Sequence, residues 1–196
     1  MTASRGSRRL LTALVAGVLL LAGRSMEGRM DDQTAAVTEV KAAIVSSFAQ
    51  FIEWPSGAIP ATAPLLLCVV NDSAVADAVE RTIQGRSVGG HSLAVKSLAS
   101  DASVAGCQVV YIAGSNPKRS LDAVAGAGAR AFTVGESSDF TTVGGMVRLF
   151  RRSDRLRFEV NVDAVQRSGL KLSSRVLALG DVVRDKSGGA APPDRH

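Results

Sequence analysis

Histidine is nearly absent from this chain, whose only copies are His91 and His196. A Ser-His-Asp triad would have to use His91, which begins an expected strand. No G-x-S-x-G elbow, P-loop or H-E-x-x-H motif is present. A zinc site would require Cys68, Cys107 and His91 to converge, with no closely spaced ligand pair to anchor them. Because paired acids and bases with a catalytic spacing are also missing, the sequence predicts no enzyme, no metal and no cofactor.

One glycine-rich stretch, GRSVGG at Gly85–Gly90, resembles a phosphate-binding loop only superficially. It follows an expected helix and precedes an expected strand, which is the reverse of the order in a dinucleotide-binding fingerprint. We interpret it as the end of a helix followed by a turn.

The excess of basic residues is concentrated near the N-terminus. Arg5, Arg8 and Arg9 precede an apolar run at Leu10–Ala22 that is short for a membrane span, which predicts an export signal peptide. An uncleaved N-terminal anchor is the alternative. Residues 1–30 hold five of the 23 basic residues but one of the 18 acidic residues, so the remainder is nearly neutral. The overall basic charge therefore does not indicate nucleic-acid binding, even though the C-terminal half is rich in arginine.

The chain has two cysteines, Cys68 and Cys107. In an exported protein an even pair predicts a disulfide, and the alternative is two buried free thiols that pack as small apolar side chains. A bridge would close a loop of about 40 residues and stabilise the fold by about 4 kcal/mol on a chain-entropy argument.

Hydrophobic periodicity predicts helices alternating with short apolar strands. The expected helices are Thr34–Trp54, Ala74–Gln84, Asn116–Ala125, Asp163–Ser168 and Ser173–Leu179, and the expected strands are Leu65–Val70, Ser92–Leu98, Cys107–Ala113, Ala129–Val134, Met146–Arg151 and Arg155–Val160. This order predicts an α/β layered domain: a mostly parallel sheet, helices on both faces, and an antiparallel C-terminal hairpin at the edge. We expect one domain at residues 31–185, after a signal peptide and lead-in at 1–30 and before a disordered tail at 186–196.

Three groups of residues are candidates for contact with a partner or ligand, although each also has a structural interpretation that we favour. Trp54 could lie over a ligand or cap the core at a helix end. Gly144 and Gly145 could bring backbone close to a ligand or allow a tight turn. Glu159 and Asn161 could bind a polar solute, or form a cross-strand ion pair and an Asx turn. The candidate residues are Phe51, Glu53, Trp54, Gly144, Gly145, Met146, Arg157, Glu159 and Asn161.

Short motifs spread over residues 38–180 resemble those of a known family. They are Val40–Ala43 (VKAA), Phe48–Pro55 (FAQFIEWP), Cys107 at the start of a strand, Phe140, Gly144–Met146 (GGM), Arg157–Asn161 (RFEVN) and Gly169–Ser173 (GLKLS). In this combination the chain resembles the YfiR-like periplasmic regulatory proteins. The resemblance covers nearly all of the expected domain.

This resemblance implies a periplasmic, non-enzymatic regulator. The best-known member of the family represses an inner-membrane diguanylate cyclase by binding its periplasmic sensor portion, which restrains cyclic-di-GMP synthesis. Family members are dimer-prone, so the resemblance also implies a possible homodimer. The well-studied member has an additional cysteine pair in its C-terminal half that this chain lacks, so redox control through that pair does not carry over. A periplasmic small-solute binding module is the alternative function.

Overall fold

The computed structural model describes residues 32–128 and 130–185. The predicted signal peptide at residues 1–30 and the predicted tail at residues 186–196 lie outside the described residues. The chain divides into two units, residues 1–38 and residues 39–196. Residues 32–38 are helical, and the fold described below belongs to the second unit.

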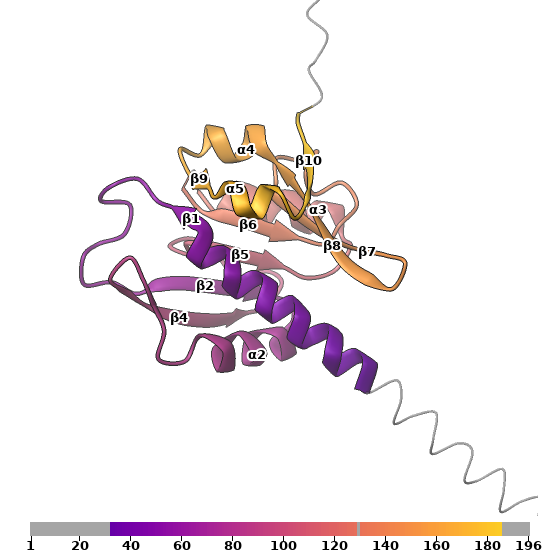
Figure 1. Cartoon of the computed structure of the whole chain (residues 1–196), viewed down its shortest axis with the longest axis horizontal. Coiled ribbons are helices and arrows are strands. Elements are labelled where there is room, and N and C mark those ends of the chain that lie inside the picture. The colour runs from indigo at the N-terminus through magenta and orange to yellow at the C-terminus, as the bar shows by residue number, and fades with distance from the viewer. Residues whose placement is uncertain (1–31, 129, 186–196) are drawn as a thin grey trace, which may run out of the picture. The chain divides into compact units, whose positions relative to one another are not determined.

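An eight-stranded sheet, in the order β10-β8-β7-β6-β5-β2-β4-β3, forms the centre of the described part of the chain (Figure 1). Its strands are β2 (Leu65–Val70), β3 (Ser87–Val88), β4 (His91–Leu98), β5 (Val109–Ile112), β6 (Phe132–Gly135), β7 (Val147–Arg152), β8 (Arg155–Asn161) and β10 (Asp181–Val183). Neighbouring strands run parallel except in the β3–β4 and β7–β8 hairpins. The predicted mostly parallel sheet is confirmed, and β10 extends it beyond the hairpin.

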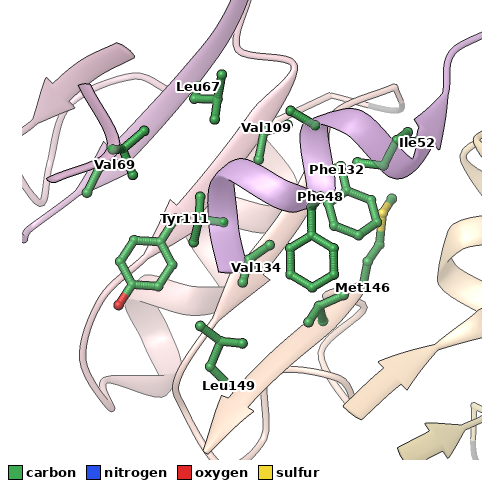
Figure 2. Packing of buried hydrophobic residues seen from close by; sticks show 14 of the residues in the cluster. Phe48, Ile52, Leu67, Val69, Val109, Tyr111, Phe132, Val134, Met146 and Leu149 are labelled. Carbon is green, nitrogen blue, oxygen red and sulfur yellow. The ribbon is translucent and has the colours of Figure 1, made fainter. Parts of the chain in front are cut away.

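Helices cover both faces of this sheet, as the sequence predicts. The helical residues 39–51 and α2 (Ser73–Ile83) pack on one face, where Phe48 lies 5.3 Å from Phe132, ring centre to ring centre (Figure 2). On the other face, α3 (Pro117–Gly126) packs against a second apolar cluster that contains Phe140. Two short helices, α4 (Val162–Arg167) and α5 (Ser174–Leu177), follow the hairpin.

The glycine-rich stretch at Gly85–Gly90 is a helix end and a turn, as predicted. The helix α2 begins where the Asp72 carboxylate accepts a hydrogen bond from the Val75 N–H. Gly85, at φ +70°, follows the last turn of α2. Gly89 and Gly90 have φ values of +57° and +87° and form the two-residue turn between β3 and β4.

The prediction for the first helix was wrong at its C-terminal end. The helix ends at residue 51, and Ile52–Glu53 form a short strand, β1, that pairs antiparallel with β9 (Lys171–Leu172). The apolar spacing of the helix continues through this segment, but its backbone pairs with a distant part of the chain, Lys171–Leu172. The short strands β3, β9 and β10 were not predicted. The strand expected at Ala129–Val134 is β6, shifted toward its C-terminal end, and the last helix is shorter than expected.

The two cysteines form the predicted disulfide, with Cα atoms 5.9 Å apart. Cys68 lies on β2, and Cys107 lies two residues before β5, the parallel neighbour of β2. Both are buried in the cluster on the α3 face. The bridge therefore joins β2 to the segment that leads into its neighbour β5.

Candidate functional site

The base of the β7–β8 hairpin is organised around the carboxylate of Glu159. Arg148 lies directly opposite on β7 and donates to both oxygens, Nε to Oε1 at 2.9 Å and one terminal nitrogen to Oε2 at 3.0 Å. The Thr141 hydroxyl also donates to Oε1, at 2.8 Å. Burial raises the pKa of Glu159, but the bonds from Arg148 and Thr141 outweigh it and hold this pKa below its ordinary value. The cross-strand ion pair suggested by the sequence is present.

Asn161 ends β8 and ties three segments together. Its side-chain oxygen accepts from the Ala164 N–H at 3.0 Å and so caps α4. Its side-chain nitrogen donates to the Thr141 carbonyl at 2.9 Å and to Asp185 at 2.7 Å. Its backbone N–H donates to the Met146 carbonyl at 2.8 Å. With all of these groups bonded and only 1% of the residue exposed, Asn161 acts as a structural clamp.

The glycine pair before β7 shapes the packing of one aromatic ring. Gly144 has φ +97°, which favours glycine. Gly145 has an ordinary φ but lies against Phe140, where an added Cβ would come closer than 3.0 Å to the ring. A Cβ at Gly135 would also meet the Phe140 ring at less than 3.0 Å. The fully buried Phe140 ring is therefore held between two glycines, and close packing rather than a turn explains the second glycine of the pair.

A second polar cluster, which was not predicted, lies at the carboxyl ends of β5 and β6. We call Lys41, Tyr111 and Glu136 the Glu136 cluster. Lys41 from the first helix lies 2.5 Å from Glu136 Oε1, and the Tyr111 hydroxyl donates to the same oxygen at 2.7 Å. The Gly114 N–H donates to Oε2 at 3.0 Å. The cluster fastens the first helix to the sheet.

In the Glu136 cluster the pKa of Tyr111 is raised and the pKa of Glu136 is lowered. Burial raises the pKa of Tyr111, and the nearby charge of Glu136 raises it further, so the phenol stays neutral. Burial also acts to raise the pKa of Glu136. The bonds from Lys41, Gly114 and Tyr111 outweigh that effect and lower the pKa below its ordinary value. The carboxylate is thus held charged as a partner for Lys41.

The segment after the first helix lies beside a groove near the C-terminus of the domain. We call it the C-terminal groove; it is about 220 Å³ in volume and is lined by Val160, Val162, Val165, Gln166, Leu170, Lys171, Leu172 and Leu177. Glu53 of β1 lies opposite Lys171, and Phe51 accepts a backbone bond from Ser173 at 2.9 Å. Trp54 packs against the core, and its indole nitrogen is buried without a hydrogen-bond partner.

The nine candidate residues are placed in three regions. Beside the C-terminal groove lie Phe51, Glu53 and Trp54. At the base of the hairpin lie Gly144, Gly145, Met146, Glu159 and Asn161. Arg157 lies on the outer part of the hairpin. They do not form one site. The sequence did carry a signal for the missed Glu136 cluster, because Lys41 interrupts the apolar stripe of the helix and Glu136 directly follows a buried strand.

Neither a metal centre nor a membrane span is found in the described residues. No group of three or more His, Cys, Asp or Glu side chains in that part of the chain is placed to hold a metal ion. No helix within residues 32–128 and 130–185 is long and apolar enough to cross a membrane.

Comparison with protein families gives a match that spans these features. A family model described as YfiR/HmsC-like matches residues 38–181. The matched range contains the Glu136 cluster, the disulfide, the hairpin and the C-terminal groove. It also contains each motif on which the sequence resemblance was based. The chain belongs to the YfiR/HmsC-like family.

Proposed function

We propose that this protein is a periplasmic, non-enzymatic regulator that binds the periplasmic portion of an inner-membrane diguanylate cyclase and restrains cyclic-di-GMP synthesis. The observation that carries the proposal is the family match over residues 38–181. The YfiR-like family has a regulatory rather than a catalytic role and acts in the periplasm. The predicted signal peptide would supply the required export.

The polar clusters of the domain are better explained as structural than as catalytic. General acid–base catalysis at neutral pH favours groups whose pKa values lie near 7. The pKa values of Glu136 and Glu159 are instead lowered, and both carboxylates are engaged by neighbouring donors. Tyr111, whose pKa is raised, is held in its neutral form. These groups stabilise the fold.

The C-terminal groove favours a protein partner over a small solute. Pockets for small molecules commonly have volumes of about 300–1,000 Å³, whereas this groove is about 220 Å³. Its lining is mostly valine and leucine, with Gln166 and Lys171 as its polar members. A groove of this size and lining suits one apolar side chain of the membrane partner.

Measurement of cyclic-di-GMP in cells tests the proposal. Deletion of the gene should raise the cyclic-di-GMP level, and wild-type protein should restore it. Leu177→Arg, which places a charge in the groove, should fail to restore it. Leu121→Arg is the matched control, because Leu121 is 50% exposed on α3 and is not among the groove residues. An unchanged level after deletion, with no membrane protein recovered by crosslinking, would contradict the proposal.

The alternative, a small-solute binding module, is tested by the fluorescence of Trp54, the chain's single tryptophan. This side chain belongs to the segment beside the groove, so a bound solute should change its emission. A set of periplasmic metabolites is titrated against the wild-type protein and the Leu177→Arg variant. A saturable response lost in the variant would favour the solute-binding function, and no response would exclude it for the compounds tested.

A further inference from the structure

The outer part of the β7–β8 hairpin projects beyond its neighbouring strands (Figure 1). The two strands pair with each other from Val147–Val160 to Arg152–Arg155. Within the described residues, β6 pairs only with Val147 and Arg148, and β10 pairs only with Glu159–Asn161. Both outer edges of the remaining hairpin are therefore free, and we call residues 149–158 the hairpin arm.

One face of the hairpin arm is fixed against the domain. Leu149 is buried, and the Phe158 ring packs edge-on against Phe48 of the first helix, with ring centres 5.7 Å apart. A Cβ at Gly180 would come closer than 3.0 Å to the Phe158 ring, so the chain that follows α5 also lies tightly against this side. The orientation of the arm is therefore set by packing.

The opposite face is dominated by arginine. Because side chains alternate along a strand, the cross-strand pairs on this face are Arg148–Glu159, Phe150–Arg157 and Arg152–Arg155. We call these six residues the arginine face; Arg148 and Glu159 form its end at the base of the hairpin, and the other four belong to the arm. The guanidinium carbons of Arg148 and Arg152 lie 4.6 Å and 5.2 Å from the centre of the Phe150 ring. Both arginines therefore make cation–π contacts with one half-buried phenyl ring.

The charge of the arginine face is only partly neutralised. Glu159 pairs with Arg148, and Asp181 lies 3.4 Å from Arg152. Among the residues that the structure describes, Arg155 and Arg157 have no carboxylate within ion-pairing distance. Arg152 and Arg155 are directly opposite, and like charges in that position destabilise a strand pair. A ligand that brings negative charge to this face would relieve the repulsion.

We propose that the arginine face of the hairpin arm binds an acidic segment of a partner protein. This inference rests on the proposed function, to which it adds a second contact surface and the chemistry of the partner. Guanidinium groups bind carboxylates through paired hydrogen bonds. The free edges of β7 and β8 offer backbone donors and acceptors to an extended segment beside them. Phe150 supplies an apolar contact between the charged groups.

An acidic protein segment fits the hairpin arm better than an anionic membrane does. Asp154 occupies the turn at the tip, and its side chain is 99% exposed, so it would meet the lipid phosphates first. Phe150, the aromatic side chain of this face, lies under two guanidinium groups rather than free to enter the lipid interface. Arg157 lies further from the turn than Arg155, so a protein carboxylate can reach it without approaching Asp154.

The experiment measures binding of the whole protein to a fluorescein-labelled peptide of alternating glutamate and valine. The matching lysine–valine peptide and phosphatidylglycerol vesicles are measured in parallel. Wild-type protein should bind the acidic peptide, and affinity should fall as salt rises from about 0.05 M to about 0.5 M. The double variant Arg155→Glu with Arg157→Glu should bind at least about tenfold more weakly, because each substitution reverses a charge at the contact.

The matched control reverses two exposed arginines elsewhere, Arg86→Glu with Arg130→Glu, and should change affinity by less than about twofold. Thermal melting of both double variants checks that they fold. Equal weakening by the two variants, or binding to the vesicles without binding to the acidic peptide, would overturn the inference. The cyclic-di-GMP measurement is separate, so an arm that fails to bind the peptide leaves the proposed function standing.

Discussion

Replacing Gly145 with alanine tests how tightly Phe140 is held between its two glycines. A Cβ at Gly145 would lie 2.6 Å from the Phe140 carbonyl oxygen and closer than 3.0 Å to the ring. The ring cannot retreat, because it is fully buried and its other side lies against Gly135. The Phe140 carbonyl also accepts a hydrogen bond from the Gly145 N–H at 2.9 Å, so a shift that separates these two groups weakens the bond.

The expected loss in the free energy of unfolding is about 3 kcal/mol. Forcing an extra carbon into a well-packed core costs about 1–3 kcal/mol, and a weakened backbone bond adds about 1 kcal/mol. Urea denaturation of Gly145→Ala against wild type measures this loss. Gly126→Ala is the matched control: Gly126 lies in α3, and its added Cβ would meet Val104 at an ordinary 3.6 Å. It should be neutral or stabilise by up to about 1 kcal/mol.

Repeating the Gly145→Ala substitution in a Phe140→Ala variant identifies the cause of the lost stability. Phe140→Ala should itself destabilise by about 3–5 kcal/mol, but it removes the ring that the new Cβ would strike. In that background Gly145→Ala should cost less than about 1.5 kcal/mol, which leaves a clear coupling energy. Equal costs in the two backgrounds, or a cost no greater than that of Gly126→Ala, would refute the packing argument.

Two further substitutions probe the polar clusters. Glu136→Gln should destabilise by about 2 kcal/mol at pH 7, because it leaves the Lys41 ammonium without its charged partner. Since the folded-state pKa of Glu136 is lowered, this stabilisation is present above the ordinary glutamate pKa of 4.5 and is lost as pH falls through the folded value. Denaturation at a series of pH values should show the difference shrinking below about pH 4.5, and a constant difference would contradict it. Asn161→Ala should cost about 3 kcal/mol because it removes a buried helix cap, a buried bond to Thr141 and a part-buried bond to Asp185. Asn116→Ala removes the exposed cap of α3 and should cost about 1 kcal/mol. Similar costs for the two asparagine variants would exclude a clamp role for Asn161.

Local sequence patterns predicted the fold well where the elements are regular. The strand Leu65–Val70 is an unbroken apolar run followed by Asn71 and Asp72, and both the strand and the capped helix after it were placed correctly. Residues 52–53 and 171–172 could not be placed in the same way. Their strand conformation comes from pairing with each other across the domain, and no local periodicity encodes that pairing.

In the candidate site, too, features encoded by neighbouring residues could be predicted, and contacts between distant residues could not. The cap formed by Asn161 could be anticipated, because an asparagine between a strand and a helix is a local signal. The close approach at Gly145 depends on where the Phe140 ring lies, which follows from tertiary packing. The bond between Lys41 and Glu136 joins the first helix to the end of β6, so each residue alone gave no sign of its partner.

The pairing of β1 with β9 has a consequence for how the chain matures. β1 lies directly after the first helix and β9 lies close to the end of the domain, so this pairing joins an early segment of the chain to a late one. A chain that emerges with its N-terminus first presents Ile52 long before Leu172, and β1 has no partner until then. We therefore expect the domain to stay incomplete until the segment that contains β9 has been synthesised.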